Sequence, residues 1–174
     1  AEIGYPVTLK TAAPDIAHKT EAGGVALNLR NAAEVETAAH HMARLGPDVL
    51  VERMVTGVVA ELIIGLKRDP QFGLALVVGA GGILTELLKD SITLLLPTSR
   101  EEISRNLRRL KVWKLVEGYR GKAGDQKAVI DAVMAVARFA DANSTTIEEL
   151  DINPLLVLLH GAIAVDALIR LRRI

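Results

Sequence analysis

The chain has 174 residues, half of them hydrophobic and 3% aromatic, which suits one ordinary domain or two small lobes with an aliphatic core. Its 21 basic and 21 acidic residues cancel, which argues against a general nucleic-acid binder. With no cysteine, no signal peptide and no apolar run of about 20 residues, the sequence favours a cytoplasmic protein without disulfides, thiolate metal sites or a membrane span.

The first residues, AEIGYPVTLK, lack an initiator Met and resemble the last turn of a helix that stops at Gly4. We therefore expect a truncated piece of a longer protein. Strands are predicted after this stub wherever β-branched or alternating apolar residues are bounded by turn residues. The predicted strands span residues 5–12, 25–30, 49–55, 58–69, 74–82, 91–97, 147–159 and 162–171.

Three helices are predicted between these strands. Asn31 with Glu34 forms a capping box that begins a helix running to about Leu45, and Ser99 with Glu102 begins another that runs to about Leu110. Residues 125–143 place their apolar side chains on one face, as an amphipathic helix does. The mixed order of strands and helices favours an α+β fold over a doubly wound parallel sheet.

Two polar residues in ELDINPLLVL, Asp151 and Asn153, lie two apart and share one side of an extended strand. A turn at His160-Gly161 places residue 168 opposite Asn153 and leaves Asp166 diagonal to it, about 7–8 Å away on the same face. Oxygen ligands in small number suit Mg²⁺. Solvated residues at a sheet edge are an equally weighted alternative, and a three-residue turn would move Asp166 to the other face.

The loop PDIAHKTEAGG contains His18 and the pair Gly23-Gly24, whose backbone N–H groups could face a phosphate. Lys10 lies within an apolar strand and needs an anion if it is buried, although a lysine reaching solvent from the pleat edge is the alternative. A lone loop histidine is more often simply exposed. The stretch VVGAGGI lacks the third glycine of the dinucleotide fingerprint, so that function is not predicted.

Several stretches together resemble one family in chain order. They are GYPVTLKTAAPDIAHKTEAGGVALNL, VLVERMV, ELIIGLKRDPQFG, GAGGILTELLKD, LVEGYRG and ELDINPLLV with AVDALI. This set is similar to the ATP-grasp domain of NDP-forming acyl-CoA synthetases, relatives of the succinyl-CoA synthetase β chains. The resemblance implies an N-terminally truncated ATP-grasp fold, in which residues 1–55 form part of the small lobe. Residues 56–174 would form the large lobe that carries the magnesium-binding hairpin.

The resemblance also implies roles for single residues. Lys10 would hold the α- and β-phosphates of ATP or ADP. Glu52 would receive the adenine amino group beside the backbone of Arg53 and Met54. Glu61 would bind the ribose hydroxyls.

Further roles concern the phosphates and the metal. Lys67 and Arg68 would contact phosphate, and Gly81 and Gly82 would lie near the transferred phosphoryl group. Asn153 and Asp166 would bind Mg²⁺, the same pair that strand register suggests. His18 matches the histidine of the family's PDI.HK stretch, which is thought to carry phosphate.

The implied parent enzyme converts acid, CoA and ATP to acyl-CoA, ADP and phosphate through an acyl phosphate and a phosphohistidine on a partner domain. Its partners would be a CoA-binding domain and a ligase-type CoA domain, fused or on a separate chain, in an oligomer without nucleic acid or membrane. Two alternatives remain open: a degenerate regulatory module of a protein lysine acetyltransferase, and a non-catalytic subunit-docking domain. The sequence does not identify the acid.

Overall fold

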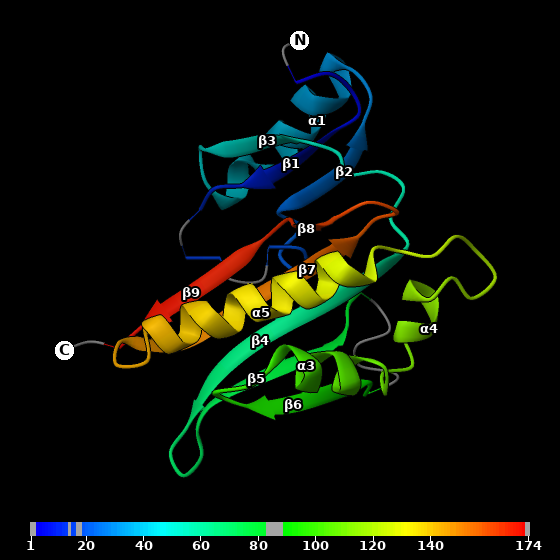
Figure 1. Ribbon diagram of the computed structural model, residues 1–174. Helices are drawn as coiled ribbons and strands as arrows, with labels where there is room; N and C mark the ends of the chain where they lie inside the picture. Colours follow the sequence, from blue (N-terminus) through cyan, green and yellow to red (C-terminus); the bar gives the residue numbers. More distant parts are fainter. Residues whose placement is uncertain (1–2, 14, 17–18, 83–88, 173–174) are drawn as a thin grey trace. The chain divides into compact units, whose positions relative to one another are not determined.

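The structure is a computed structural model that describes residues 3–13, 15–16, 19–82 and 89–172 (Figure 1). The chain divides into two units, Ala1–Thr56 (unit 1) and Gly57–Ile174 (unit 2), and each unit has its own sheet. The mixture of helices with antiparallel sheets confirms the expected α+β class.

Unit 1 is a three-stranded antiparallel sheet with one helix. The strands, in the order β2-β1-β3, are β1 (Val7–Thr11), β2 (Val25–Leu29) and β3 (Val49–Arg53). Helix α1 (Ala32–Met42) and the short η1 (Ala43–Leu45) connect β2 to β3. The side chains of Val7, Leu9 and Met42 are buried, so the central strand and the end of the helix supply the apolar packing of this unit.

The start of α1 has the capping arrangement that its sequence predicts. The side-chain oxygen of Asn31 accepts a hydrogen bond from the backbone N–H of Glu34 at 3.0 Å. The Glu34 carboxylate in turn accepts one from the backbone N–H of Arg30 at 2.8 Å. These contacts satisfy N–H groups that have no partner within the helix, and they fix where the helix begins.

Unit 2 contains a six-stranded antiparallel sheet. Its order is β6-β5-β4-β7-β8, and β9 also pairs with β7. The strands are β4 (Ala60–Asp69), β5 (Gly73–Ala80), β6 (Ser91–Leu95), β7 (Ile147–Val157), β8 (Ala162–Ala164) and β9 (Ala167–Leu171). The predicted last strand is thus interrupted at Val165 and Asp166.

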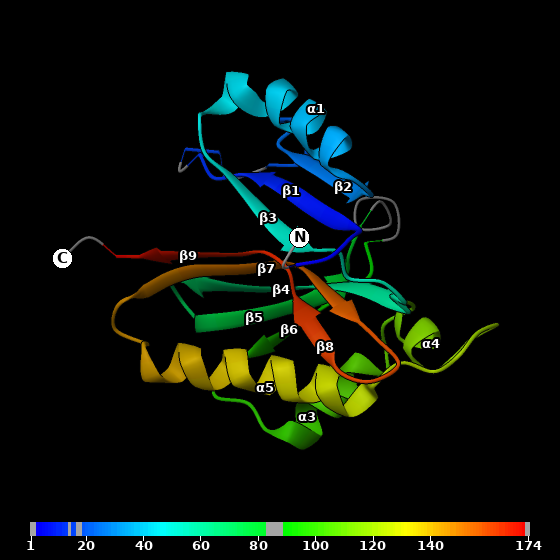
Figure 2. The same cartoon turned by 90° about the horizontal axis from the view of Figure 1, so that it is seen from above.

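Helices cover one face of this sheet. Helix α3 (Arg100–Leu107) and helix α5 (Gln126–Ala142) lie on the same side of the strands, and the short α4 (Trp113–Val116) stands between them in the chain (Figure 2). Alternate residues of β4 and β5, such as Leu62, Ile64 and Val78, are fully buried against these helices. Among the described residues, no helix is both long and apolar enough to cross a membrane.

The register of the last hairpin differs from the expected one by two residues. Leu155 pairs with Ala164 and Ile152 with Ala167, so the hairpin closes around Leu159-His160 rather than His160-Gly161. The N–H of Leu158 donates to the carbonyl of Gly161 at 3.0 Å, which marks the two-residue loop. Because side chains alternate with a period of two, a shift of two residues leaves each side chain on its expected face.

Candidate functional site

The face of the unit 2 sheet that α3 and α5 leave uncovered (the open face) gathers most of the expected site residues of this unit. Leu62, Ile64 and Leu66 of β4 point into the core, so the alternation of the strand gives the other face to its odd-numbered residues. These residues are Glu61, Ile63, Gly65 and Lys67. On the neighbouring β7, Glu149 and Asp151 pair with Lys67 and Gly65 and belong to the same face.

Asn153 and Asp166 lie directly opposite each other. The backbone N–H of Asn153 donates to the carbonyl oxygen of Asp166 at 3.3 Å, between the pairs that β7 forms with β8 and β9. Asn153 also lies at a bulge of β7, where two residues of β7 face a single residue of β4, Ile63. The two residues are thus direct neighbours across the strands rather than diagonal ones, and an amide and a carboxylate oxygen are a donor set that fits Mg²⁺.

Glu61 is close to the glycine pair that follows β5. Its carbonyl accepts the N–H of Gly81 at 2.8 Å. A Cβ on Gly82, which has a φ of +67°, would lie 2.8 Å from the Glu61 Oε2 atom, so the carboxylate lies over this glycine. This contact could not be predicted from local sequence signals, because Glu61 and Gly82 are 21 positions apart.

Lys67 and Arg68 are not brought together. Lys67 is exposed on the open face, about 20 Å along β4 from Glu61 at the usual rise of a strand. The Arg68 guanidinium donates to the carbonyl of Ile147 at 2.9 Å and also to that of Ser144. Arg68 therefore ties the start of β7 to the end of β4, and its use by backbone carbonyls does not favour the expected phosphate contact.

In unit 1, two expected nucleotide ligands form an ion pair. Lys10 on β1 is 8% exposed, and its Nζ atom lies 2.6 Å from Oε2 of Glu52 on β3. Antiparallel pairing of Thr8 with Glu52 and of Lys10 with Leu50 places both side chains on one face of this sheet. The lysine is thus positioned, almost free of solvent, beside a carboxylate that remains partly exposed.

After Glu52, the backbone N–H of Met54 is bonded within the sheet, whereas the backbone groups of Arg53 face the free edge of β3. The N–H of Met54 donates to the carbonyl of Pro6 at 3.1 Å, so the pairs formed by residues 54 and 52 with β1 are hydrogen-bonded ones. Arg53 belongs to the alternate pair, with Val7, and its N–H and carbonyl point away from β1. Arg53 can therefore offer a donor and an acceptor to a planar ring, whereas the Met54 N–H is already used.

The loop between β1 and β2 uses its glycine N–H groups internally. The N–H of Gly23 donates to the carbonyl of Thr20 at 3.1 Å, and that of Gly24 to the carbonyl of Lys19 at 2.7 Å. A Cβ on Gly24 would lie 2.6 Å from the Thr11 side chain, which explains why a glycine is needed there. The expected phosphate carrier, His18, lies outside the described residues.

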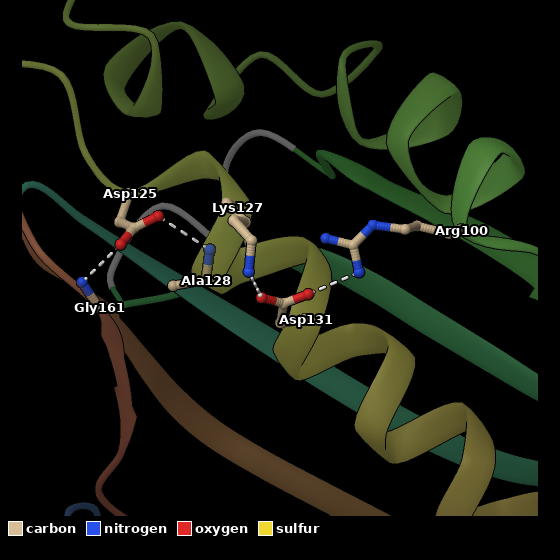
Figure 3. A network of polar contacts seen from close by, with 6 residues as sticks. All are labelled: Arg100, Asp125, Lys127, Ala128, Asp131 and Gly161. Atoms are coloured by element: carbon tan, nitrogen blue, oxygen red, sulfur yellow. Dashed lines mark hydrogen bonds and ion pairs between the residues drawn. The ribbon is translucent and has the colours of Figure 1, made fainter.

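A network of carboxylates fixes the last hairpin and α5 (Figure 3). The Asp125 carboxylate accepts the backbone N–H of Ala128 at 2.9 Å, as the N-cap of α5, and that of Gly161 at 2.9 Å, beside the hairpin loop. These two backbone bonds lower the pKa of Asp125. The pKa of Asp131 is lowered by its hydrogen bonds with Lys127 and Arg100, which join α5 to α3.

Residues 1–171 match an ATP-grasp domain family. The chain belongs to this family. The expected ATP-grasp fold is therefore confirmed.

Relatives of this ATP-grasp domain are acyl-CoA ligases. The chain is 38% identical to a protein from Pyrococcus furiosus named the beta subunit of ADP-forming acetate–CoA ligase I, over 95% of this chain and 75% of that subunit. It is 37% identical to an ADP-forming acetate–CoA ligase I from Archaeoglobus fulgidus, over 94% of this chain but only 25% of that protein. The chain thus spans about three quarters of one relative and a quarter of the other.

A solved structure shows the same fold at similar identity. An acetyl-coenzyme A synthetase from Candidatus Korarchaeum cryptofilum, in complex with coenzyme A and Mg-AMPPCP, superimposes with a TM-score of 0.83 at 37% identity. The match covers 98% of this chain and 78% of the other. That structure is described as having a phosphohistidine segment pointing towards its nucleotide-binding site.

Proposed function

We propose that this ATP-grasp domain binds Mg-ATP and moves its terminal phosphoryl group within an ADP-forming acyl-CoA synthetase. The observation that carries the proposal is the direct pairing of Asn153 with Asp166, on the sheet face that also presents Glu61. This arrangement supplies hard oxygen ligands beside a carboxylate suited to ribose hydroxyls. Relatives named as ADP-forming ligases give the reaction class.

The donor set fits a magnesium ion that is shared with the nucleotide. Among the described residues, no three His, Cys, Asp or Glu side chains cluster closely enough to hold a metal alone. Two protein oxygens leave most of an octahedral shell to water and phosphate, which is how Mg²⁺ is usually bound beside ATP. When bound, the ion neutralises charge on the phosphate oxygens.

The chain's own residues would orient the nucleotide. In unit 1, Glu52 and the edge-facing backbone of Arg53 bind the adenine, while Lys10 holds the α- and β-phosphates. In unit 2, Glu61 accepts the ribose hydroxyls, and Gly81 and Gly82 lie near the terminal phosphate. Fixed donors of this kind lower the barrier because they need no reorganisation as charge develops.

The proposed phosphoryl acceptor is the imidazole of His18. A bond forms between an imidazole nitrogen and the terminal phosphorus while the bond from that phosphorus to the ADP oxygen breaks. The imidazole proton is released, and the reverse step makes ATP. Lys67 would supply a cation on the open face, whereas Arg68 holds the backbone of Ser144 and Ile147.

The complete reaction belongs to the parent enzyme. It would join an acid to CoA at the expense of ATP, with release of ADP and phosphate, and would need the CoA-binding and ligase-type domains that the matched region lacks. We propose a cytoplasmic, oligomeric parent. The choice of acid would be made in those other domains.

Thermal unfolding of the full-length parent with Mg-AMPPCP tests the proposal. At a nucleotide concentration of about 100 times Kd, binding to the native state alone adds about 2.7 kcal/mol, which raises the Tm by several degrees. We expect Asn153→Ala and Asp166→Ala to remove most of this rise. Asp141→Ala, at an exposed carboxylate on α5, is the matched control and should leave the rise intact.

Two outcomes of this experiment would contradict the proposal. Equal nucleotide-dependent shifts in the wild type, Asn153→Ala and Asp166→Ala would show that the pair does not hold the metal. No shift in the wild-type parent at millimolar Mg-AMPPCP would contradict nucleotide binding altogether.

A further inference from the structure

One segment of unit 2 carries a third of the positive charge of the chain. Between Ser104 and Gly124 there are seven basic residues and one acidic residue, Glu117, in a protein of zero net charge. The seven are Arg105, Arg108, Arg109, Lys111, Lys114, Arg120 and Lys122, and we call their side chains the basic surface. The remaining residues of the chain must carry an equal negative excess, so the charge separation is built into the sequence.

The fold of this segment points its basic side chains outward. Ile103, Leu107, Leu110, Trp113 and Val116 are buried in the core of unit 2, and the seven basic residues between and after them are all exposed. Successive backbone hydrogen bonds keep the segment compact. One runs from the N–H of Leu110 to the carbonyl of Leu107, and another from the N–H of Gly124 to that of Val116.

A buried carboxylate supports the middle of the segment. Asp90, which is 9% exposed, accepts the backbone N–H groups of Lys111 and Val112, each at 2.8 Å. It therefore anchors the backbone at the turn between α3 and α4 while the side chain of Lys111 stays outside. The loop after α4 projects from unit 2 in both views (Figures 1 and 2).

The basic surface is almost unneutralised within the described part of the chain. Lys114 lies 3.3 Å from the Glu117 carboxylate, but none of the other six basic side chains has a described carboxylate within ion-pairing distance. The nearby Arg100 is different, because it is paired with Asp131. Six like charges held on one short segment repel one another, and an acidic partner would relieve that repulsion.

Apolar and aromatic side chains accompany these charges. Leu115 is 37% exposed and Tyr119 is 60% exposed, and the Arg120 guanidinium lies 5.4 Å from the centre of the Tyr119 ring. Tyrosine and arginine are the residue types that contribute most at the centres of protein interfaces, and charged rims steer the partner. This composition is that of a docking surface for a folded protein.

We propose that the basic surface docks an acidic face of another domain or subunit of the parent acyl-CoA synthetase, an inference that rests on the proposed function. The A. fulgidus relative has three quarters of its length outside the matched region. A parent of similar length would offer those further domains as partners for this one. A nucleic acid fits less well, because the chain has a pI of about 7.2 and an aromatic content of 3%, against the strong basic excess of a typical binding domain.

Zero-length cross-linking of the intact parent enzyme tests this docking. A carbodiimide joins lysine amines to carboxylates that touch them, so Lys111, Lys114 or Lys122 should be recovered by mass spectrometry joined to an Asp or Glu outside the 174 residues. Arg108→Glu with Arg109→Glu should reduce the yield about tenfold, since like charges then face each other. Arg30→Glu with Arg138→Glu changes the net charge equally at exposed sites elsewhere and should leave the yield unchanged.

The outcomes separate this inference from the proposed function. Thermal unfolding with Mg-AMPPCP is measured on the same samples. If the variant with two glutamates is unstable, the variant with Arg108→Gln and Arg109→Gln replaces it. A normal nucleotide shift with cross-links confined to the 174 residues would overturn the docking alone. Binding of a labelled single-stranded 20-mer through Arg108 and Arg109, without cross-links to protein, would overturn it in favour of a nucleic acid. Absence of the nucleotide-dependent Tm rise in the wild-type parent would instead contradict the proposed function.

Discussion

Lys67 and Arg68 are consecutive on β4, and because side chains of a strand alternate between its faces, they serve different surfaces. Lys67 is exposed on the open face beside Glu149 of β7. Arg68 turns to the covered face and donates to backbone carbonyls where α5 gives way to β7. Two cations that the family resemblance groups together therefore differ in what their removal should do.

Alanine substitutions should separate the two roles. Arg68→Ala removes charged hydrogen bonds to backbone carbonyls, worth about 1.5–3 kcal/mol, and should lower the urea midpoint without weakening Mg-AMPPCP binding. Lys67→Ala should leave the midpoint nearly unchanged and, as a residue of the open face, weaken nucleotide binding. Urea unfolding and nucleotide titration of both variants decide the matter. A weaker nucleotide affinity in Arg68→Ala at unchanged stability would restore its expected phosphate role.

Lys10 gives a second prediction at this scale. Its ammonium is paired with Glu52 in a site with little solvent, where desolvation offsets much of the attraction between the charges. Lys10→Met keeps the packing volume and leaves the Glu52 side chain 37% exposed, so water can solvate its charge, and we expect a change in unfolding free energy of no more than about 1 kcal/mol. The same variant should lose the Tm rise with Mg-AMPPCP, because the proposed phosphate cation is gone. A normal rise would remove Lys10 from the nucleotide site.

Local sequence signals predicted where helices begin, but they could not predict features that depend on contacts between residues far apart in the chain. The caps at Asn31 and Ser99 each involve a residue only three positions away, so the start of α1 and of α3 could be predicted. The register of the last hairpin depends instead on Asp125, 36 positions before Gly161, and on the bulge at Asn153, neither of which a turn motif reveals. The even difference in register replaces the predicted diagonal arrangement of Asn153 and Asp166 by a direct one and leaves both residues on the predicted face.

The Asp125 link between α5 and the hairpin should make stability depend on pH. Its pKa is lowered by the N–H groups of Ala128 and Gly161, so the folded state holds the proton less tightly than the unfolded chain. The stabilisation is therefore complete above the unfolded value of about 3.9 and is lost as the pH falls through the lower folded value. Asp125→Asn keeps one acceptor oxygen but loses the charge, and should be less stable than the wild type at pH 7.

The difference in urea midpoint between Asp125→Asn and the wild type should shrink as the pH is lowered from 5 towards 2.5. Asp141→Asn, at an exposed position of the same helix, provides the control for changes in net charge. A difference that stays constant over this range would mean that the carboxylate charge at residue 125 contributes nothing to the folded state.

For the whole molecule, the two units differ in how much apolar surface they bury. The large cluster of buried residues runs from Ala60 to Val157 and lies entirely within unit 2. In unit 1, buried apolar side chains are few, and β2 is an edge strand paired only with β1. Since local opening costs least where few apolar contacts are lost, unit 1 should open before unit 2.

Hydrogen exchange of the full-length parent measures this order and its response to nucleotide. Without nucleotide, we expect the amides of β4 and β5 to exchange slowest and those of β2 to exchange much faster, at rates set by opening of unit 1 alone. Mg-AMPPCP should slow exchange in β1 of unit 1 as well as in β7 of unit 2, by up to about 100-fold at 100 times Kd, because ligands are proposed from both units. Asp166→Ala should abolish the slowing in both. Slowing confined to one unit would show that the other does not contribute to nucleotide binding.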